Sequence, residues 1–466
     1  MVGKECPTIQ QEVSVNRQYL GVVWRILLAL YISTSLYEGY LTIPGLGPHS
    51  VFSLIQRVLV FTLPFVVLYM VIRGDRRLIV PLVSLTLWLF LVGITFIADS
   101  PHTYYYFYYV WSQVGGYLLV LSFWYLALYP EWLRWTLRLA IPIYFSATMV
   151  LSLWEIKTAH HLAQSRENGL HPTHIPTAFY FDPNNLGTAL ALMLPFIVFL
   201  GILWRRRWVY WVSAVLTLVG LFVLYKTGSR GGELALVLDL AALPVVLRGR
   251  SRTIALSILG LIVVVMVAAI VSLQSLPSTA HLPFALVKLK HMVDLLNFSP
   301  HKVTAHRGPG SVMIRLALLK SGLHALSLHP LGLGPRGAER YYAYWLHHPS
   351  PYNTYGIIDA HNMWLENAID FGWAGLALYA LFYFWVLIGL FRLINHHDPM
   401  IRFVTTAGVP ALFGFILGSL SPSSVMIGFN VMWVVYGMGV AAISLSQICQ
   451  HSNRIQQQRF DRAEES

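Results

Sequence analysis

The stretch TIALSILGLIVVVMVAAIVSL runs from Thr253 to Leu273 without a charged side chain. An α-helix rises about 1.5 Å per residue, so a stretch of this length can cross a hydrocarbon core of about 30 Å. Its apolar residues are continuous, whereas a strand of a membrane barrel would alternate. Arg248, Arg250 and Arg252 stand just before it, as is typical of the cytoplasmic end of a membrane helix. The stretch therefore predicts a transmembrane helix.

The whole chain has the composition of a protein made of such helices. Of its 466 residues, 56% are hydrophobic and 11% are charged, whereas about 25% of the residues in an average soluble domain are charged. We expect an all-α polytopic membrane protein with about twelve transmembrane helices. The candidate segments are 20–36, 51–72, 78–98, 107–129, 132–154, 185–204, 208–226, 233–247, 253–273, 372–394, 401–419 and 425–447.

The net charge of +12 would suggest nucleic-acid binding in a soluble protein. In a membrane protein, basic residues instead hold cytoplasmic loops in place, so we expect a lipid bilayer and no nucleic acid as partner. The basic connections alternate along the chain, and the intervening connections 37–50, 99–106 and 420–424 contain no Lys or Arg. The positive-inside rule then places both termini in the cytoplasm, as an even number of crossings also requires.

The chain divides into three parts on this reading. Residues 1–273 hold nine transmembrane helices, 274–360 form a large external loop between helices 9 and 10, and 361–466 hold three helices and a cytoplasmic tail. Loops of this length are uncommon and usually functional. Amphipathic stretches such as 312–326 predict short helices at the membrane surface. We therefore expect the chemistry on the external face.

Cations gather on that face against the topology rule. They are Lys226, Arg230, Lys288, Lys290, Lys302, Arg307, Arg315, Lys320, Arg336 and Arg340, whereas the acidic residues of 274–360 are Asp294, Glu339 and Asp359. One explanation is that long loops are translocated whatever their charge. The other is a site for an anionic ligand, for which phosphate at the membrane edge is the obvious candidate.

Arg230 is the most distinctive of these cations because it lies in the turn Thr-Gly-Ser-Arg-Gly-Gly, residues 227–232. Glycines on both sides let the backbone turn tightly, and the helix expected from about Glu233 points its free amides at this turn. Such helix N-termini attract phosphate. Lys226 and Arg336 are candidates to assist. The alternative is a simple hairpin turn with one snorkelling arginine.

His361 and Asn362 close the external loop and open a helix. A neutral imidazole can take a proton from a hydroxyl at neutral pH, which makes His361 a candidate general base. The alternative is a capping or interfacial histidine.

Two further candidates are less specific. Asn184 lies in Asp-Pro-Asn-Asn, residues 182–185, whose plain reading is a capped helix start. Arg57 falls within the second segment, where a charge is costly unless it faces a cavity or a partner. The histidine pairs 160–161 and 347–348 lack the spacing of a zinc site, so we expect no metal and no cofactor.

Several pieces in this order resemble a known family. They are Phe-Asp-Pro-Asn-Asn-Leu (181–186), Thr-Gly-Ser-Arg-Gly-Gly (227–232), Arg315 ahead of His-Pro-Leu-Gly-Leu-Gly-Pro (329–335), and Ala-His-Asn-Met-Trp-Leu-Glu (360–366) leading to Phe-Gly-Trp-Ala-Gly (371–375). Each piece alone is weak, but their order and common external placement are fairly specific. The chain resembles the O-antigen ligase and O-antigen polymerase superfamily of bacterial membrane glycosyltransferases.

The resemblance implies a GT-C-type architecture in the bacterial inner membrane, with the active site on the periplasmic face. It implies a donor glycan carried on undecaprenyl diphosphate, held by Arg230 and Arg315, with His361 as catalytic base and no metal. An acceptor hydroxyl on lipid A core would make the protein a ligase, and another lipid-linked repeat would make it a polymerase. The sequence leaves this choice open. Single displacement predicts inversion at the anomeric carbon.

Two functions from other classes remain. A twelve-helix transporter often has two six-helix halves joined by a cytoplasmic linker, whereas the longest loop here is external and the halves do not match. A non-catalytic assembly scaffold is the third possibility.

Overall fold

The computed structural model describes residues 15–37, 51–72, 79–99, 103–162, 165, 167, 173–274, 311–348, 354, 356–422, 426 and 429–465. These residues form helices and no strand. The helices are α1 (Val15–Ser35), α2 (Val51–Ile72), α3 (Ile79–Asp99), α4 (Tyr104–Leu126), α5 (Pro130–Thr158), α6 (Pro183–Val198), α7 (Leu200–Trp204), α8 (Arg207–Thr227), α9 (Arg230–Val246), α10 (Gly249–Gln274), α12 (Ser311–Leu328), α13 (Gly337–Leu346), α14 (Met363–Arg392), α15 (Pro399–Gly418) and α16 (Asn430–Glu465).

The all-helical membrane character is confirmed for the described residues. Eleven of the twelve expected segments each overlap one helix, and segment 185–204 overlaps two, α6 and α7. By length and composition, 6 of the helices can cross a membrane, and three shorter apolar helices accompany them. The number of twelve crossings stays a prediction, as do the three-part division of the chain and the GT-C architecture.

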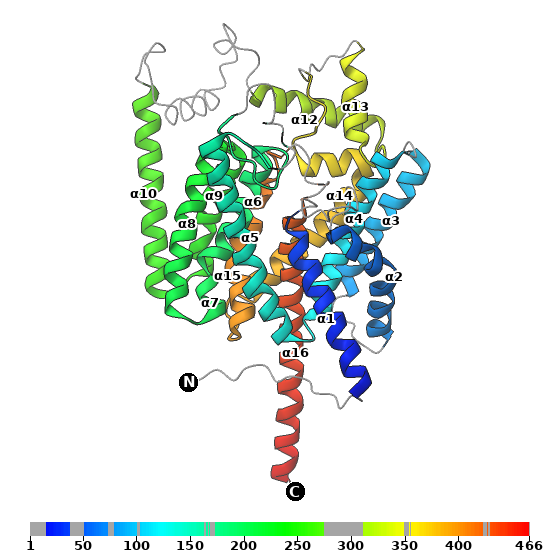
Figure 1. Ribbon diagram of the computed structural model, residues 1–466, viewed down its shortest axis with the longest axis vertical. Coiled ribbons are helices and arrows are strands. Elements are labelled where there is room, and N and C mark those ends of the chain that lie inside the picture. The colour runs from blue at the N-terminus through cyan, green and yellow to red at the C-terminus, as the bar shows by residue number, and fades with distance from the viewer. Residues whose placement is uncertain are drawn as a thin grey trace.

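Long helices pack side by side into one bundle, α12 lies across one of its ends, and α13 stands upright at the same end (Figure 1). We call this the outer end. The first residues of α1 and the last residues of α16 lie at the opposite end (Figure 1). α16 is the most enclosed of these membrane-spanning helices, because 94% of the residues in its apolar stretch are buried. α15 packs against α6, α9, α14 and α16, so these helices form the centre of the bundle.

Two helices start before the expected membrane segments that they contain. α14 starts at Met363, where Asn362 was expected to open a helix and caps it, and it continues through a kink at Gly372 into segment 372–394. Gly372 has φ +70°, a conformation that glycine adopts without steric cost. The helix of segment 233–247 also starts earlier, at Arg230, because Ser229 caps it. Both changes bring candidate site residues to helix N-termini.

The region 274–360, expected to be external, holds the short helices that the sequence predicts. α12 covers the expected stretch 312–326, and α13 follows it. They pack with the first turns of α14 around a small apolar core of their own, which includes Leu318, Tyr342 and Ile369. Four of the external cations, Lys288, Lys290, Lys302 and Arg307, lie outside the described residues.

Candidate functional site

The start of α9 is fixed by a cap and by close backbone packing. Ser229 is the N-cap, and its hydroxyl accepts a hydrogen bond from Gly232 N at 3.2 Å. Gly228 ends α8 with φ +66°, which favours glycine. A Cβ on Gly232 would lie 2.7 Å from the carbonyl oxygen of Gly187 in α6. Arg230, the first residue of α9, is therefore held where α6 and α9 touch.

The start of α6 lies in the same place. Asp182 caps this helix, because its carboxylate accepts a hydrogen bond from Asn184 N at 2.7 Å. The side chain of Asn184 is turned elsewhere, and its Oδ1 accepts from the Ser421 hydroxyl at 3.3 Å. The structure thus gives the capping role to Asp182 and brings Asn184 to a contact that joins the N-terminus of α6 to the segment after α15.

The start of α14 is the third N-terminus. Asn362 caps it, and its Oδ1 accepts hydrogen bonds from Trp364 N at 3.1 Å and Leu365 N at 3.2 Å. His361 precedes the cap with φ +47°, a left-handed conformation that is uncommon for a residue with a Cβ. Its Nδ1 lies 3.2 Å from the main-chain oxygen of Ser421. A carbonyl oxygen only accepts, so this hydrogen bond requires a proton on Nδ1, and it selects the neutral tautomer in which Nε2 has a free lone pair.

Arg315 reaches the same point from α12. Its Nη2 lies 3.5 Å from the Ser421 hydroxyl, at the limit of a hydrogen bond. Burial lowers the pKa of Arg315, the positive charge of Arg230 lowers it further, and the negative charge of Asp182 opposes both. The charge of Arg230 therefore acts unfavourably on Arg315, and a bound anion that interacts with both would relieve this repulsion.

We call Asn184, Ser229, Arg230, Arg315, His361 and Ser421 the Ser421 cluster. It joins the N-termini of α6, α9 and α14 to α12, and it contains two arginines and one imidazole. Helix N-termini carry partial positive charge even where a side chain caps some of their amides, so this arrangement attracts an anion. Chemically, it can hold a phosphate group beside a proton acceptor.

The glycine-rich stretch 329–335 has a structural role beside this cluster. Its backbone is bonded to the kink of α14, since Leu333 N donates to Ile369 O at 2.9 Å and Trp373 N donates to Pro330 O at 3.1 Å. A Cβ on Gly332 would lie 2.5 Å from the carbonyl oxygen of Asp370. Only glycine allows the backbone of residues 329–335 to approach the backbone at the kink of α14 so closely.

Asp370 completes this junction and caps α13. Its carboxylate is buried and accepts hydrogen bonds from Ala338 N at 2.8 Å, Arg336 N at 3.1 Å and the Tyr109 hydroxyl at 2.8 Å. It satisfies amides that a helix start leaves open. The junction fixes α13, and through it α12, which bears Arg315.

The remaining candidates make other contacts. Arg336 forms an ion pair with Glu339, and its Nε donates to this carboxylate at 2.5 Å. Lys226 is exposed, with its ammonium 5.6 Å from the centre of the Phe222 ring on the same helix. Arg57 is exposed on α2, which packs against α1 and α4. The described contacts do not bring these three side chains to Ser421.

Asp359 lies two residues before His361 and was not singled out from the sequence. Burial raises its pKa, while His361 and Arg336 lower it and Glu339 and Asp182 raise it. Asp359 is therefore linked electrostatically both to the imidazole and to the Arg336–Glu339 pair.

One external histidine now has a physical role. The side chains of His161 and Glu155 are fully buried, and His161 Nδ1 lies 3.4 Å from Glu155 Oε1. The other carboxylate oxygen of Glu155 accepts from Thr177 N and Ala178 N, both at 2.8 Å. His161 Nε2 lies 3.2 Å from Thr173 O. The pair therefore ties the end of α5 to the segment that leads to Asp182.

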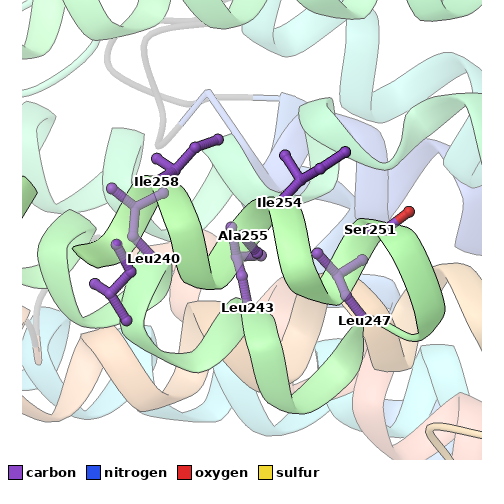
Figure 2. A pocket seen from close by; sticks show the side chains of 8 residues that line it. Leu240, Leu243, Leu247, Ser251, Ile254, Ala255 and Ile258 are labelled. Atoms are coloured by element: carbon purple, nitrogen blue, oxygen red, sulfur yellow. The ribbon is translucent and has the colours of Figure 1, made fainter. Parts of the chain in front are cut away.

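An apolar cavity of about 280 Å³ lies between α9 and α10, away from the cluster. Its walls are aliphatic side chains of the two helices, with Ser251 near one end (Figure 2). α10 packs against α9 at the edge of the bundle (Figure 1). The cavity has no charged group for a phosphate, so it suits hydrocarbon and is not the site of the chemistry.

The comparisons with known proteins agree with the resemblance seen in the sequence. Residues 215–380 match the family described as O-antigen ligase, a range that contains Arg230, Arg315 and His361. A curated relative is the teichuronic acid biosynthesis protein TuaE of Bacillus subtilis (strain 168), which is 24% identical over 310 residues. This alignment covers 64% of the present chain and 58% of the relative. Residues 215–380 thus resemble the O-antigen ligase family, and the apolar helices agree with a multi-pass membrane protein.

Proposed function

We propose that this protein transfers a glycan from undecaprenyl diphosphate to an acceptor hydroxyl at the outer end of the bundle. The observation that carries the proposal is the contact of Ser421 Oγ with Arg315 Nη2 at 3.5 Å and with Ser229 Oγ at 3.4 Å, because Ser229 directly precedes Arg230 at the start of α9. A diphosphate would add negative charge beside these two arginines. The match of residues 215–380 to the O-antigen ligase family supports the same ligand class.

His361 is proposed as the general base. Its Nδ1 is held by the Ser421 carbonyl at 3.2 Å, so Nε2 can receive the proton of the acceptor hydroxyl. The acceptor oxygen then forms a bond to the anomeric carbon as the bond from that carbon to the diphosphate breaks. The electron pair leaves with the diphosphate, and one displacement inverts the anomeric centre.

Arg230 and Arg315 are proposed to stabilise the charge that grows on the departing diphosphate. Lys226, Arg336 and Asn184 are proposed as secondary contacts for the donor, and Asn362 as the cap that holds His361 at the start of α14. The fully charged guanidinium groups would take the part of a metal ion in this mechanism.

We also propose that the outer end faces the periplasm or cell exterior, with both termini in the cytoplasm and the protein in the inner (cytoplasmic) membrane. The basic connections support this orientation, because they alternate with connections that lack Lys and Arg. Nucleotide-sugar donors are not supplied outside the cytoplasm, so a lipid-linked donor fits a site on that face.

A transfer assay tests this function. The purified protein receives a lipid-linked glycan and an acceptor, and wild type is compared with His361→Ala and Arg230→Ala. Loss of a general base costs about 10²–10⁴-fold in rate, and loss of one charge-stabilising donor costs about 10²–10³-fold. His348→Ala and Lys320→Ala are matched controls, because both side chains are exposed on the external helices. Full transfer by His361→Ala and Arg230→Ala would refute the proposal.

Polymerisation of lipid-linked repeats is the second candidate. The matched relative is named for teichuronic acid biosynthesis and not for transfer to lipid A core, which supports this alternative. The same purified protein separates the two when it is given donor alone or donor with lipid A core. Chains of repeats formed from donor alone indicate a polymerase, and transfer that requires the core indicates a ligase.

A further inference from the structure

Ser421 lies at the centre of the cluster and is buried, although its sequence context gives no sign of a role. Its hydroxyl oxygen lies 3.4 Å from Ser229 Oγ, 3.5 Å from Arg315 Nη2 and 3.3 Å from Asn184 Oδ1. These three side chains come from the starts of α9, α12 and α6. One hydroxyl thus meets three helices.

The donors and acceptors around this hydroxyl are complementary. A serine hydroxyl has one hydrogen to donate and two lone pairs to accept with. Ser421 donates to Asn184 Oδ1, and Arg315, which has only donors, gives a hydrogen to Ser421 Oγ. The remaining lone pair can accept the Ser229 hydroxyl hydrogen. The one hydrogen and the two lone pairs of the Ser421 hydroxyl can therefore each take part in a hydrogen bond.

The main chain of Ser421 contacts the imidazole of His361. The Ser421 carbonyl oxygen lies 3.2 Å from His361 Nδ1. Two residues earlier, Ser419 O accepts a hydrogen bond from Met363 N at 3.1 Å, which ties this segment to the start of α14. Displacement of residue 421 would thus move the base and the phosphate-binding arginine together.

We infer that Ser421 is a positioning residue, whose hydroxyl holds Arg315 and whose carbonyl orients His361 toward a common ligand. The inference rests on the proposed glycosyl transfer and deepens it. The hydroxyl aligns Arg315 beside Arg230 before the donor binds, so the two guanidinium groups need not reorganise. The carbonyl fixes the imidazole tautomer that leaves Nε2 available.

A double-mutant cycle tests the hydroxyl. Ser421→Ala, Arg315→Lys and the double variant are purified, and the KM for lipid-linked donor and kcat are measured for each. Arg315→Lys keeps the charge but not the planar fork, so residual activity remains for the cycle. We expect Ser421→Ala to lower kcat/KM for the donor roughly tenfold, the size of a lost hydrogen bond to a charged group. The KM for the acceptor should stay at the wild-type value.

If Ser421 acts through Arg315, its substitution should cost much less in the Arg315→Lys background than in wild type. Equal losses in both backgrounds, or wild-type kinetics in Ser421→Ala, would overturn the inference. Ser419→Ala is the matched control, because its buried hydroxyl bonds only to Ile416 O, at 3.0 Å, among the described contacts. We expect this control to keep wild-type kinetics.

Two further outcomes are kept distinct. If Ser421→Ala fails to fold, Ser421→Cys, which is nearly the same size and has a weaker donor and acceptor, takes its place in the cycle. If His361→Ala and Arg230→Ala lose transfer while Ser421→Ala does not, only the role of Ser421 fails. If all three variants transfer glycan like wild type, the proposed function itself fails.

Discussion

Gly231 lies against Ser421 so closely that a Cβ on Gly231 would overlap the Cβ of Ser421 and lie 3.3 Å from its Cα. Gly231 follows Arg230 in the first turn of α9. Packing therefore explains why residue 231 is a glycine: it lets the segment after α15 contact the start of α9. Because Gly231 has no side chain, the backbone next to Arg230 can pack directly against Ser421.

Gly231→Ala should strongly reduce transfer and lower the Tm. The added methyl group must displace the backbone at Ser421, and overpacking of this kind costs about 1–3 kcal/mol. Adding Ser421→Gly removes the overlapping Cβ, so the double variant should recover much of the Tm without recovering full activity. Thermal unfolding in detergent measures this recovery. Gly93→Ala is the control, because a Cβ at Gly93 in α3 would meet nothing within 4 Å.

Asp370→Ala should loosen α12 and α13 and weaken donor binding, although Asp370 is not expected to touch the donor. Its carboxylate accepts from Ala338 N, Arg336 N and the Tyr109 hydroxyl. Leaving such donors unsatisfied costs about 1–3 kcal/mol each. Tyr109→Phe removes one of these bonds and should lower stability by only about 1 kcal/mol. Equal stability of Asp370→Ala and wild type would contradict this role of the junction.

Glu155→Gln should lower stability by about 1–3 kcal/mol, since it leaves buried His161 without its carboxylate partner. The variant should also increase protease access to the segment between α5 and α6. His160→Ala is the neighbouring control, because His160 is exposed and such surface changes stay within about 0.5 kcal/mol. Limited proteolysis and thermal unfolding report on the two effects. Identical behaviour of the two variants would show that the buried pair does not hold this segment.

Asp359→Asn should raise the Tm at neutral pH. Burial raises the pKa of Asp359 in the folded protein, so the folded state binds a proton more tightly than the unfolded state. Stability from this group is therefore present at low pH and is lost as pH rises from the unfolded to the folded pKa. The Tm difference between the two proteins should shrink toward pH values below about 4, where the carboxyl is protonated in both states. A difference that grows toward low pH would contradict this sign.

The sequence was sufficient for the helices and for much of the cluster. Continuous apolar stretches mark a membrane helix wherever it packs, so each expected segment overlaps one or two helices. Arg230 stood out because of its glycine-rich turn, whereas Arg315 and His361 became candidates mainly because the motifs around them resemble those of the O-antigen ligase superfamily. Asn184 and Asn362 were placed correctly at helix starts.

The contacts that join these helices could not be read from the sequence. Ser421 belongs to a run of small polar residues, and nothing in Ser-Pro-Ser-Ser separates one serine from the next. Its role comes from packing against Gly231 and from contacts with three other helices. The role of Asp370 could not be predicted from the sequence for a different reason. It lies before a kink that depends on the φ of Gly372, a property of the folded backbone.

The central claim is that the two arginines bind the donor diphosphate while His361 removes the acceptor proton. Binding and transfer therefore have to be measured on the same proteins, with a polyprenyl-diphosphate glycan as the ligand. We expect His361→Ala to bind this donor with the wild-type Kd but to lose transfer, and Arg230→Ala and Arg315→Ala to bind it at least roughly tenfold more weakly. Wild-type donor affinity in both arginine variants, together with full transfer by His361→Ala, would contradict the account.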